Sequence, residues 1–442
     1  MANKIKLKRS TVAGKIPDAA DLDIGEVAVN TADGVFYVKH SDNSIKSIGN
    51  STIITGNISL DASSNIIYVA KNGDDTSQGG LTTPKLTIKA ALAEATSGTS
   101  VHVAPGIYTE DNPITIPAGV SLVGNDLRTV TVLPQTASSD FFYVKAGCYV
   151  WGLTIKDYLA NGFSYNPATA TQNVYVSPYI QNITSSTTTG TAVKIDGSLT
   201  SASSTKAMIL GFFTIINKGG KGVHITNLGY SQLVNIYTIA CDIGIHCESG
   251  AFCTLNGSDS SIGNYGLVAD GKGPEALSGI TFGSSTNGVF QIRGLAAQPK
   301  VNQTMTIDGD SNYYSIDTVR QVDGLTYEVV IQEIYVNTLA DNTTVKFYQR
   351  SAIIASAHTF EYVGAGTNPL TALPQYGGIP IEANEVIAIN GGRVTFTGTD
   401  HKGNFKIGTN LTINQTTGSI TGDSFTRSMF AMMTPYILAL EG

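Results

Sequence analysis

Three short segments decide the fold of this chain: Gly222-Val-His-Ile225, Gly244-Ile-His-Cys247 and Gly266-Leu-Val-Ala269. Their glycines recur every 22 residues, and a further strand-like stretch, Gln232–Tyr237 or Phe252–Asn256, lies between each pair of segments. Such an interval is typical of a parallel β-helix, because each coil must return the chain about 4.8 Å further along the axis to stack on the preceding coil. The sequence therefore predicts a parallel β-helix with at least two strands in each coil.

The composition of the 442 residues argues against several functional classes. Only 14% of the residues are charged and 47 are glycine, a profile of short strands and tight turns rather than helices. The formal net charge of −7 argues against nucleic-acid binding, and no apolar stretch reaches the roughly 18 residues of a membrane span. The basic segment Met1–Arg9 lacks the apolar core of a signal peptide, so we expect the protein to be made and folded in a cytoplasm.

Cysteine spacing bears on metal binding. Cys241, Cys247 and Cys253 are spaced by six residues, whereas a zinc site usually has its cysteines about two to four residues apart. We therefore expect reduced thiols in the core and no resident metal or cofactor.

Both ends of the chain carry segments that need a partner. Residues 1–50 form a small β module with a hairpin signal at Asp33-Gly34, followed by a linker over residues 51–65. A module of this size cannot bury a sufficient core alone, so we expect it to dock onto another protein or onto copies of itself. The C-terminal stretch Phe425–Leu440 is unusually apolar, which predicts burial between subunits.

The middle of the chain divides by its strand pattern. We expect residues 66–285 to form the β-helix, with the helical stretch Thr87–Ala95 covering its open end. The polar stretch near residues 160–190 is interpreted as a loop that projects from the coils. Closely spaced strands with Asp-Gly turns predict a small antiparallel β domain inserted at residues 286–350, and residues 351–442 return to coil-like strands and end in the apolar segment.

Two stretches near the N-terminus carry a resemblance to known families. Gly25-Glu-Val-Ala-Val-Asn30, followed by Ala32-Asp-Gly34 and an aromatic strand, resembles the N-terminal attachment module of many tailed-bacteriophage fibre proteins. The strand, helix and stacked strands from Ile67 onward resemble the entry of pectate-lyase-like β-helices. The second resemblance implies that the β-helix is right-handed.

Residues 220–271 and 358–420 resemble virion structural proteins of contractile-tailed cyanophages. The phrases that carry this resemblance are Gly222–Thr238, His358–Asn368 and Gly391–Gly408. It implies a homotrimeric tail fibre, tailspike or baseplate-associated component, located in the virion tail. Such a protein would contact other tail or baseplate proteins through residues 1–50, and it would have a host cell-surface glycan as a candidate ligand.

Many phage β-helices degrade polysaccharides, so the outward side chains of the repeated coils are candidates for catalytic groups. If the apolar positions of the glycine segments point inward, then His224, His246, Glu248 and Asp270 point outward. Glu248 and Asp270 would stack one strand spacing apart, near the roughly 5–5.5 Å of a retaining glycosidase pair, with His246 beside them to orient a proton or a metal. Outward polar residues usually form a solvated or subunit-facing surface, and the regular coils contain no Asp-x-Asp pair and no arginine. The sequence therefore assigns no catalytic residue and keeps Glu248, Asp270 and His246 as candidates.

The sequence thus predicts a structural component of a phage tail that takes part in virion assembly and host-surface attachment. The alternative is a polysaccharide-degrading tailspike, acting as a glycoside hydrolase or polysaccharide lyase. A third hypothesis is a passive glycan-binding adhesin, with contacts on the 160–190 loop or on residues 300–340.

Overall fold

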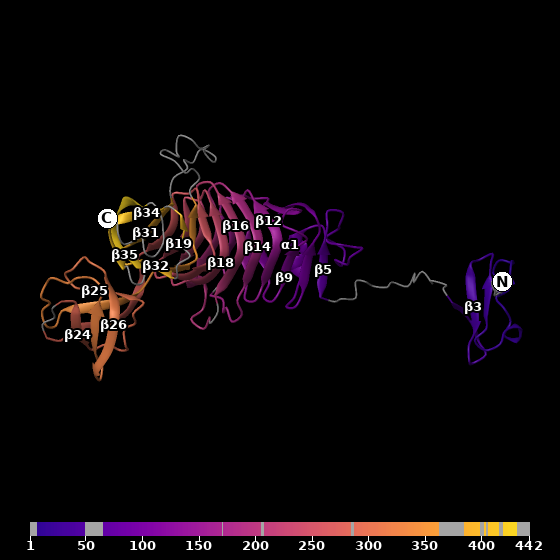
Figure 1. The fold of residues 1–442 in the computed structure, drawn as a ribbon, viewed down its shortest axis with the longest axis horizontal. Coiled ribbons are helices and arrows are strands. Elements are labelled where there is room, and N and C mark those ends of the chain that lie inside the picture. Colours follow the sequence, from indigo (N-terminus) through magenta and orange to yellow (C-terminus); the bar gives the residue numbers. More distant parts are fainter. Residues whose placement is uncertain are drawn as a thin grey trace, which may run out of the picture. The chain divides into compact units, whose positions relative to one another are not determined.

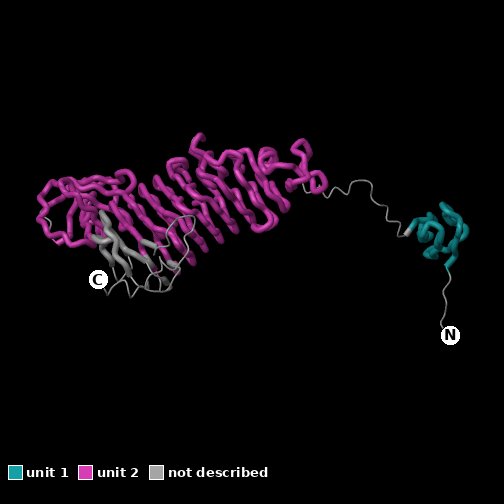
Figure 2. Tube along the Cα trace, turned by 90° about the horizontal axis from the view of Figure 1, so that it is seen from above, with its two compact units in different colours: residues 1–63 teal, residues 64–442 magenta. Residues whose placement is uncertain are grey.

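The computed structural model describes residues 7–48, 65–169, 171–204, 207–283, 287–361, 384–397, 402–403, 405–414 and 419–430. The chain forms two compact units, Met1–Ser63 and Ser64–Gly442 (Figure 2). Almost all of the regular structure is β, with one α-helix in the described part of the chain. No helix there is long and apolar enough to span a membrane.

The first unit is a four-stranded sheet in the order β1-β2-β3-β4. Its strands are β1 (Lys8–Ser10), β2 (Val27–Asn30), β3 (Val35–Lys39) and β4 (Ile45–Ile48), with a 3-10 turn, η1, at Ala19–Asp21. The predicted hairpin is confirmed, because β2 and β3 pair antiparallel around Gly34, which adopts a φ of 68°. Leu22, Ala28 and Tyr37 are the buried apolar side chains described in this unit. So small a core agrees with the expectation that the module needs a partner, which remains a prediction.

The second unit is built on a β-helix of twenty-five described strands, whose coils stack side by side in Figure 1. These strands pair in parallel except for the last one, β35, which pairs antiparallel with β32 and β34. Its first strands are β5 (Ile66–Val69), β6 (Ser100–Val103), β7 (Gly106–Glu110), β8 (Ile114–Ile116), β9 (Ser121–Gly124), β10 (Val130–Pro134), β11 (Phe142–Val144), β12 (Tyr149–Lys156) and β13 (Asn161–Ser164). The middle strands are β14 (Tyr179–Thr187), β15 (Thr191–Asp196), β16 (Met208–Asn217), β17 (Lys221–Thr226), β18 (Tyr230–Ile239), β19 (Ile243–Glu248), β20 (Phe252–Asn256), β21 (Asp259–Ser261) and β22 (Tyr265–Asp270), with a 3-10 turn, η3, at Gly197–Leu199. One hydrophobic core runs through the coils from Val69 to Val394, so the predicted fold class is confirmed.

The 22-residue interval corresponds to one coil. In parallel register, Val223 pairs with Ile245 and Ile245 with Leu267, and all three side chains are fully buried. A β-carbon on Gly222 would lie only 2.3 Å from the carbonyl oxygen of Gly244, and a β-carbon on Gly244 would lie 2.7 Å from that of Gly266. The repeated glycines are therefore required because adjacent coils approach too closely for a side chain.

Helix α1 (Ile88–Glu94) covers the first coils, as the sequence predicts. Ile88 and Leu92 are buried against the coils, and the helix packs on β5, β6, β7 and β8. Thr87 caps the helix by accepting a hydrogen bond from the backbone of Ala90. The buried carboxylate of Glu110 accepts hydrogen bonds from the first two helical N–H groups. The entry to the β-helix is thus closed by a helix whose own free N–H groups are satisfied.

The inserted domain is a closed antiparallel barrel in the order β23-β24-β27-β26-β25-β28. Its strands are β23 (Lys272–Thr281), β24 (Val289–Arg293), β25 (Gln303–Ile307), β26 (Tyr314–Asp323), β27 (Thr326–Ile331) and β28 (Thr344–Arg350), around a core of its own. The domain begins at Lys272, fourteen residues before the boundary predicted at residue 286. The predicted boundary was wrong because β23 contains Gly, Pro and Glu and forms a strand only through its irregular pairing with β28.

The polar stretch near residues 160–190 is largely part of the coils, so its interpretation as a projecting loop is corrected. β13 and β14 pair with the neighbouring coils, and β14 runs in register with both β12 and β16. Ser185 and Thr187 of β14 point inward, where the hydroxyl and carbonyl groups of Tyr158 satisfy them. Polar residues can therefore occupy the core of a coil when a buried partner is present, and only residues 165–178 connect the strands.

After the barrel, the chain resumes the β-helix. The strands are β29 (Ala352–Ser356), β30 (Thr359–Glu361), β31 (Asn384–Ile389), β32 (Arg393–Thr397), β33 (Lys402–Gly403), β34 (Phe405–Asn414) and β35 (Ser419–Phe430). β29 pairs in parallel with β20, so the coils continue past the insertion. The predicted linker at 51–65 and the end of the apolar segment after Phe430 lie outside the described residues, apart from Asn65.

Candidate functional site

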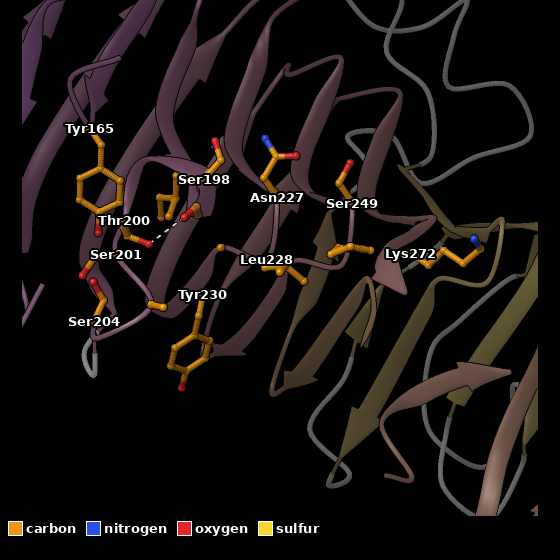
Figure 3. A pocket seen from close by; sticks show the side chains of 16 residues that line it. Tyr165, Ser198, Thr200, Ser201, Ser204, Asn227, Leu228, Tyr230, Ser249 and Lys272 are labelled. Atoms are coloured by element: carbon orange, nitrogen blue, oxygen red, sulfur yellow. Dashed lines mark hydrogen bonds between the residues drawn. The ribbon is translucent and has the colours of Figure 1, made fainter. Parts of the chain in front are cut away.

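A groove of about 830 Å³ lies along one corner of the β-helix, where successive coils turn from one strand to the next (Figure 3). We call it the corner groove. It is lined by residues 197–198, 200–202, 204, 227–230, 249 and 272–274, together with Tyr165 and Ile195. Most of these residues come from the β15–β16, β17–β18 and β19–β20 connections and from the start of β23. The others are Tyr165 directly after β13, Ile195 in β15 and Tyr230 at the start of β18. The groove therefore follows consecutive coils rather than a single loop.

Tight turns and a shared carboxylate fix the floor of the corner groove. Asn227, Leu228 and Ser249 adopt left-handed backbone conformations with φ of 52°, 61° and 54°, which turn each coil sharply. Asp196 accepts hydrogen bonds from the backbone and side chain of Ser198 at 3.0 and 2.6 Å, and from Asn227 Nδ2 at 2.9 Å. Burial raises the pKa of Asp196, but these hydrogen bonds outweigh burial and lower the pKa overall. The ionised carboxylate thus ties the turns of two successive coils together.

The groove offers one exposed aromatic ring, several hydroxyl groups and one ammonium group. Tyr230 is 39% exposed, and its ring stacks on that of Phe252 with centroids 5.3 Å apart. The Thr200 hydroxyl donates to the carbonyl oxygen of Gly197 at 2.8 Å (Figure 3). The Lys272 ammonium lies 3.6 Å from the centre of the Tyr348 ring. Such a lining combines apolar ring faces with many hydrogen-bonding groups and little net charge.

A group of titratable side chains lies on the outer face of β17 and β19, the strands that lead into the groove turns. Lys221, His224, His246 and Glu248 form this group, which we call the histidine cluster. His224 Nε2 donates to Glu248 Oε1 at 2.8 Å, and His246 Nε2 lies 3.6 Å from Glu248 Oε2. The two imidazole rings stack with centroids 5.0 Å apart, and Lys221 Nζ lies 2.9 Å from His246 Nδ1. Ser249 of the corner groove follows Glu248 directly in the chain.

Burial and neighbouring charges set the protonation of the histidine cluster. Burial lowers the pKa of His246 to about 4, with help from the positive charge of Lys221, and burial also lowers the pKa of His224. Burial raises the pKa of Glu248, but the hydrogen bond from His224, with help from the positive charge of Lys221, lowers it overall. At neutral pH the cluster therefore has two uncharged imidazoles beside an ionised carboxylate.

The structure brings together His224, His246 and Glu248, three of the four outward residues identified in the sequence. Asp270 pairs with Glu248 in register, but its carboxylate accepts from Asn390 Nδ2 at 2.9 Å, whereas that of Glu248 is bound by His224. The two carboxylates thus have separate partners, and their proposed role as a glycosidase pair remains untested. Sequence reasoning missed Lys221 and the corner groove, because turn residues such as Asn227 carry no signal until neighbouring coils align them.

No family model matches this chain, and no curated protein matches it. Among solved structures, it is similar to a pectin methylesterase in complex with a hexasaccharide, with 12% identity over 44% of this chain and a TM-score of 0.26. The chain spans 65% of that protein, slightly less than two thirds.

Two phage proteins also show similarity. For Geobacillus virus E2 ORF18 the identity is 13%, the coverage is 76% of this chain and 90% of that chain, and the TM-score is 0.20. For the tailspike protein of Acinetobacter baumannii bacteriophage Fri1, a capsular polysaccharide depolymerase, the identity is 9% and the TM-score is 0.18. This match covers 78% of this chain and 98% of that chain. At such identities and TM-scores, these similarities carry no inference about function, which depends on the site itself.

Proposed function

We propose that this protein is a component of a phage tail, of the tail-fibre or tailspike kind, whose β-helix binds a host-surface polysaccharide in the corner groove. The groove is the observation that carries this proposal. It runs across consecutive coils, so an extended polymer can contact several coils at once. Its backbone is fixed by the Asp196 hydrogen bonds and by coil stacking, so little order has to be gained when a ligand binds.

The chemistry of the lining favours a carbohydrate. Sugars present hydroxyl groups together with patches of C–H surface, and the groove lining includes the hydroxyls of Ser198, Thr200 and Ser201 as well as the Tyr230 ring. An aromatic ring stacks on the C–H face while hydroxyl and amide groups set the orientation. Lys272 is a lining residue that adds a positive charge and suits a glycan with some acidic groups.

The tail assignment rests on the N-terminal module and its resemblance to attachment modules of phage fibres. The four-stranded sheet of residues 8–48 has a very small buried core, which agrees with docking onto other tail or baseplate proteins. We further propose that the protein is a homotrimer in the virion tail.

The test is binding of the purified protein to surface polysaccharide from the host, measured by affinity electrophoresis. Tyr230→Ala removes the exposed ring, and we expect it to weaken binding about tenfold or more. Tyr179→Ala is the matched control, because Tyr179 is 38% exposed, also begins a strand and lies outside the groove lining. Equal loss of binding in both variants, or in neither, contradicts the proposal.

Cleavage is the second candidate function, and Glu248 favours it. This carboxylate is oriented by His224 and lies one residue from the groove. A reducing-end assay on the same polysaccharide distinguishes cleavage from binding. If wild type releases oligosaccharides and Glu248→Gln binds but does not release them, the protein is a depolymerase. If wild type binds the polysaccharide but releases no oligosaccharides, the protein binds without cleaving.

A further inference from the structure

The histidine cluster has the donor geometry of a metal site. The ligating atoms of His224, His246 and Glu248 all lie within 4.8 Å of one another. The two histidines occupy the same position on adjacent coils, since His224 pairs with His246 in register. Glu248 lies two residues after His246, so its side chain projects on the same face of β19. The stacked backbone therefore holds three donors together before any ligand arrives.

One atom in the cluster has no partner. His246 Nε2 makes no hydrogen bond, although the side chain is only 8% exposed and this nitrogen faces Glu248. At 3.6 Å the Glu248 oxygen is too far for a good hydrogen bond. A buried polar atom without a partner is costly and rare in native proteins, and its presence calls for a missing ligand. A cation placed between His246, His224 and Glu248 would satisfy this nitrogen.

We propose that His224, His246 and Glu248 bind a divalent transition-metal ion, with zinc as the expected occupant. Two imidazole nitrogens and one carboxylate suit zinc, cobalt, nickel or ferrous iron, whereas calcium and magnesium prefer oxygen donors only. Zinc ligand distances of about 2.0–2.2 Å place donor atoms roughly 3.4 Å apart, so side-chain shifts on the order of 1 Å close the site.

Lys221 opposes this ion and provides an internal control. Its ammonium lies 2.9 Å from His246 Nδ1, and Lys194 pairs with His224 in register on the preceding coil. An ammonium can only donate, so this contact places the ring proton of neutral His246 on Nε2. Metal binding through Nε2 requires that proton to move to Nδ1 and the ammonium to turn away, and the positive charge also weakens attraction for a cation. The Lys221→Met substitution keeps most of the aliphatic length but removes the charge, so it should tighten metal binding. A merely structural role for the cluster predicts no such gain.

The metal would also join β17 to β19 across the stacked coils. Because the ion binds the folded state and not the unfolded chain, its addition should raise the midpoint of thermal unfolding. This effect does not depend on the ligand of the corner groove, so the metal site and the proposed polysaccharide binding can fail separately.

The experiment uses untagged full-length protein treated with a chelator and then dialysed. Co²⁺ is titrated and followed by its visible absorption, and Zn²⁺ binding is measured by calorimetry. We expect one ion per chain in the wild type, an affinity at least tenfold lower in His224→Gln and Glu248→Gln, and tighter binding in Lys221→Met. His102→Gln is the control, because His102 lies on β6 outside the cluster and should leave binding unchanged.

Three results would overturn the proposal. They are no Co²⁺ or Zn²⁺ binding by wild type, equal binding in wild type and in both ligand variants, or Ca²⁺ and Mg²⁺ binding as tightly as zinc. If His224→Gln does not fold, Glu248→Gln decides the matter, since Glu248 is 31% exposed and its substitution preserves the shape of the side chain. Far-UV circular dichroism of each variant confirms the fold before titration.

Discussion

The close stacking of glycines predicts a large effect of one methyl group at Gly222. In Gly222→Ala, the new β-carbon would lie 2.3 Å from the Gly244 carbonyl oxygen, a backbone atom that cannot rotate away. The two coils must separate by at least about 0.7 Å, from 2.3 Å to 3.0 Å, before the contact becomes tolerable. Overpacking of this kind costs about 1–3 kcal/mol, and each strand hydrogen bond weakened between β17 and β19 adds about 0.5–1.5 kcal/mol. We expect a loss of roughly 2–4 kcal/mol in unfolding free energy.

Gly211→Ala is the matched control. Gly211 is also a buried strand glycine of the β-helix, but its β-carbon would meet only the Gln181 side chain, at 3.2 Å, and that side chain can move. We expect the free energy of unfolding of this variant to change by no more than about 1 kcal/mol. Part of that change is a small stabilisation, because alanine reduces the conformational entropy of the unfolded chain. The assay is urea unfolding followed by far-UV circular dichroism, approached from both the folded and the unfolded state. If Gly222→Ala is as stable as Gly211→Ala, close coil contact does not explain the glycine repeat.

Three other predictions concern the core and the insertion. Asn217→Ala should lower the free energy of unfolding by about 3 kcal/mol, because the fully buried Asn217 side chain makes hydrogen bonds with the backbone of Gly190, Gly220 and Lys221. A loss below about 1 kcal/mol in urea unfolding contradicts this prediction. Burial raises the pKa of the Cys148 and Cys241 thiols to about 12, above their ordinary value of 9.0, so their contribution to stability is complete below pH 9 and is lost as pH rises toward 12. Alkylation of Cys148 and Cys241 by iodoacetamide, located by peptide mass spectrometry, should therefore occur only together with unfolding, and alkylation of these two thiols in the folded protein contradicts the burial. Replacing the barrel, residues 272–350, by a short Gly-Ser linker should preserve the circular dichroism spectrum of the β-helix. The two ends of the insertion lie next to each other, because Ser351 N donates to Gly271 O at 3.0 Å. Loss of the β-helix signal would show that the coils need the barrel.

The sequence predicts the coils well, because a coil is a local pattern. Gly222 and Gly244 stand one coil apart, and the apolar residues between them identify the inward face without knowledge of any distant contact. The same reasoning places His224, His246 and Glu248 on one face. It fails at β14, where Ser185 and Thr187 are polar yet buried, because their partner Tyr158 is distant in the sequence.

The corner groove could not be predicted from the sequence. Its lining residues lie in turns up to about 100 residues apart, and residues such as Asn227 and Ser249 have the composition of ordinary turns. Only the stacking of the coils aligns those turns into a groove. The start of the barrel at Lys272 was missed for a related reason, since β23 becomes a strand through its pairing with β28, more than sixty residues away.

Hydrogen–deuterium exchange with and without host polysaccharide tests whether the corner groove is the ligand site. If the polysaccharide binds there, exchange should slow in residues 197–204 and 227–230, next to Ser249 and at residues 272–274. Exchange should not change at the Tyr179 end of β14. Protection confined to the barrel or to the N-terminal module, with the groove unchanged, would contradict this prediction.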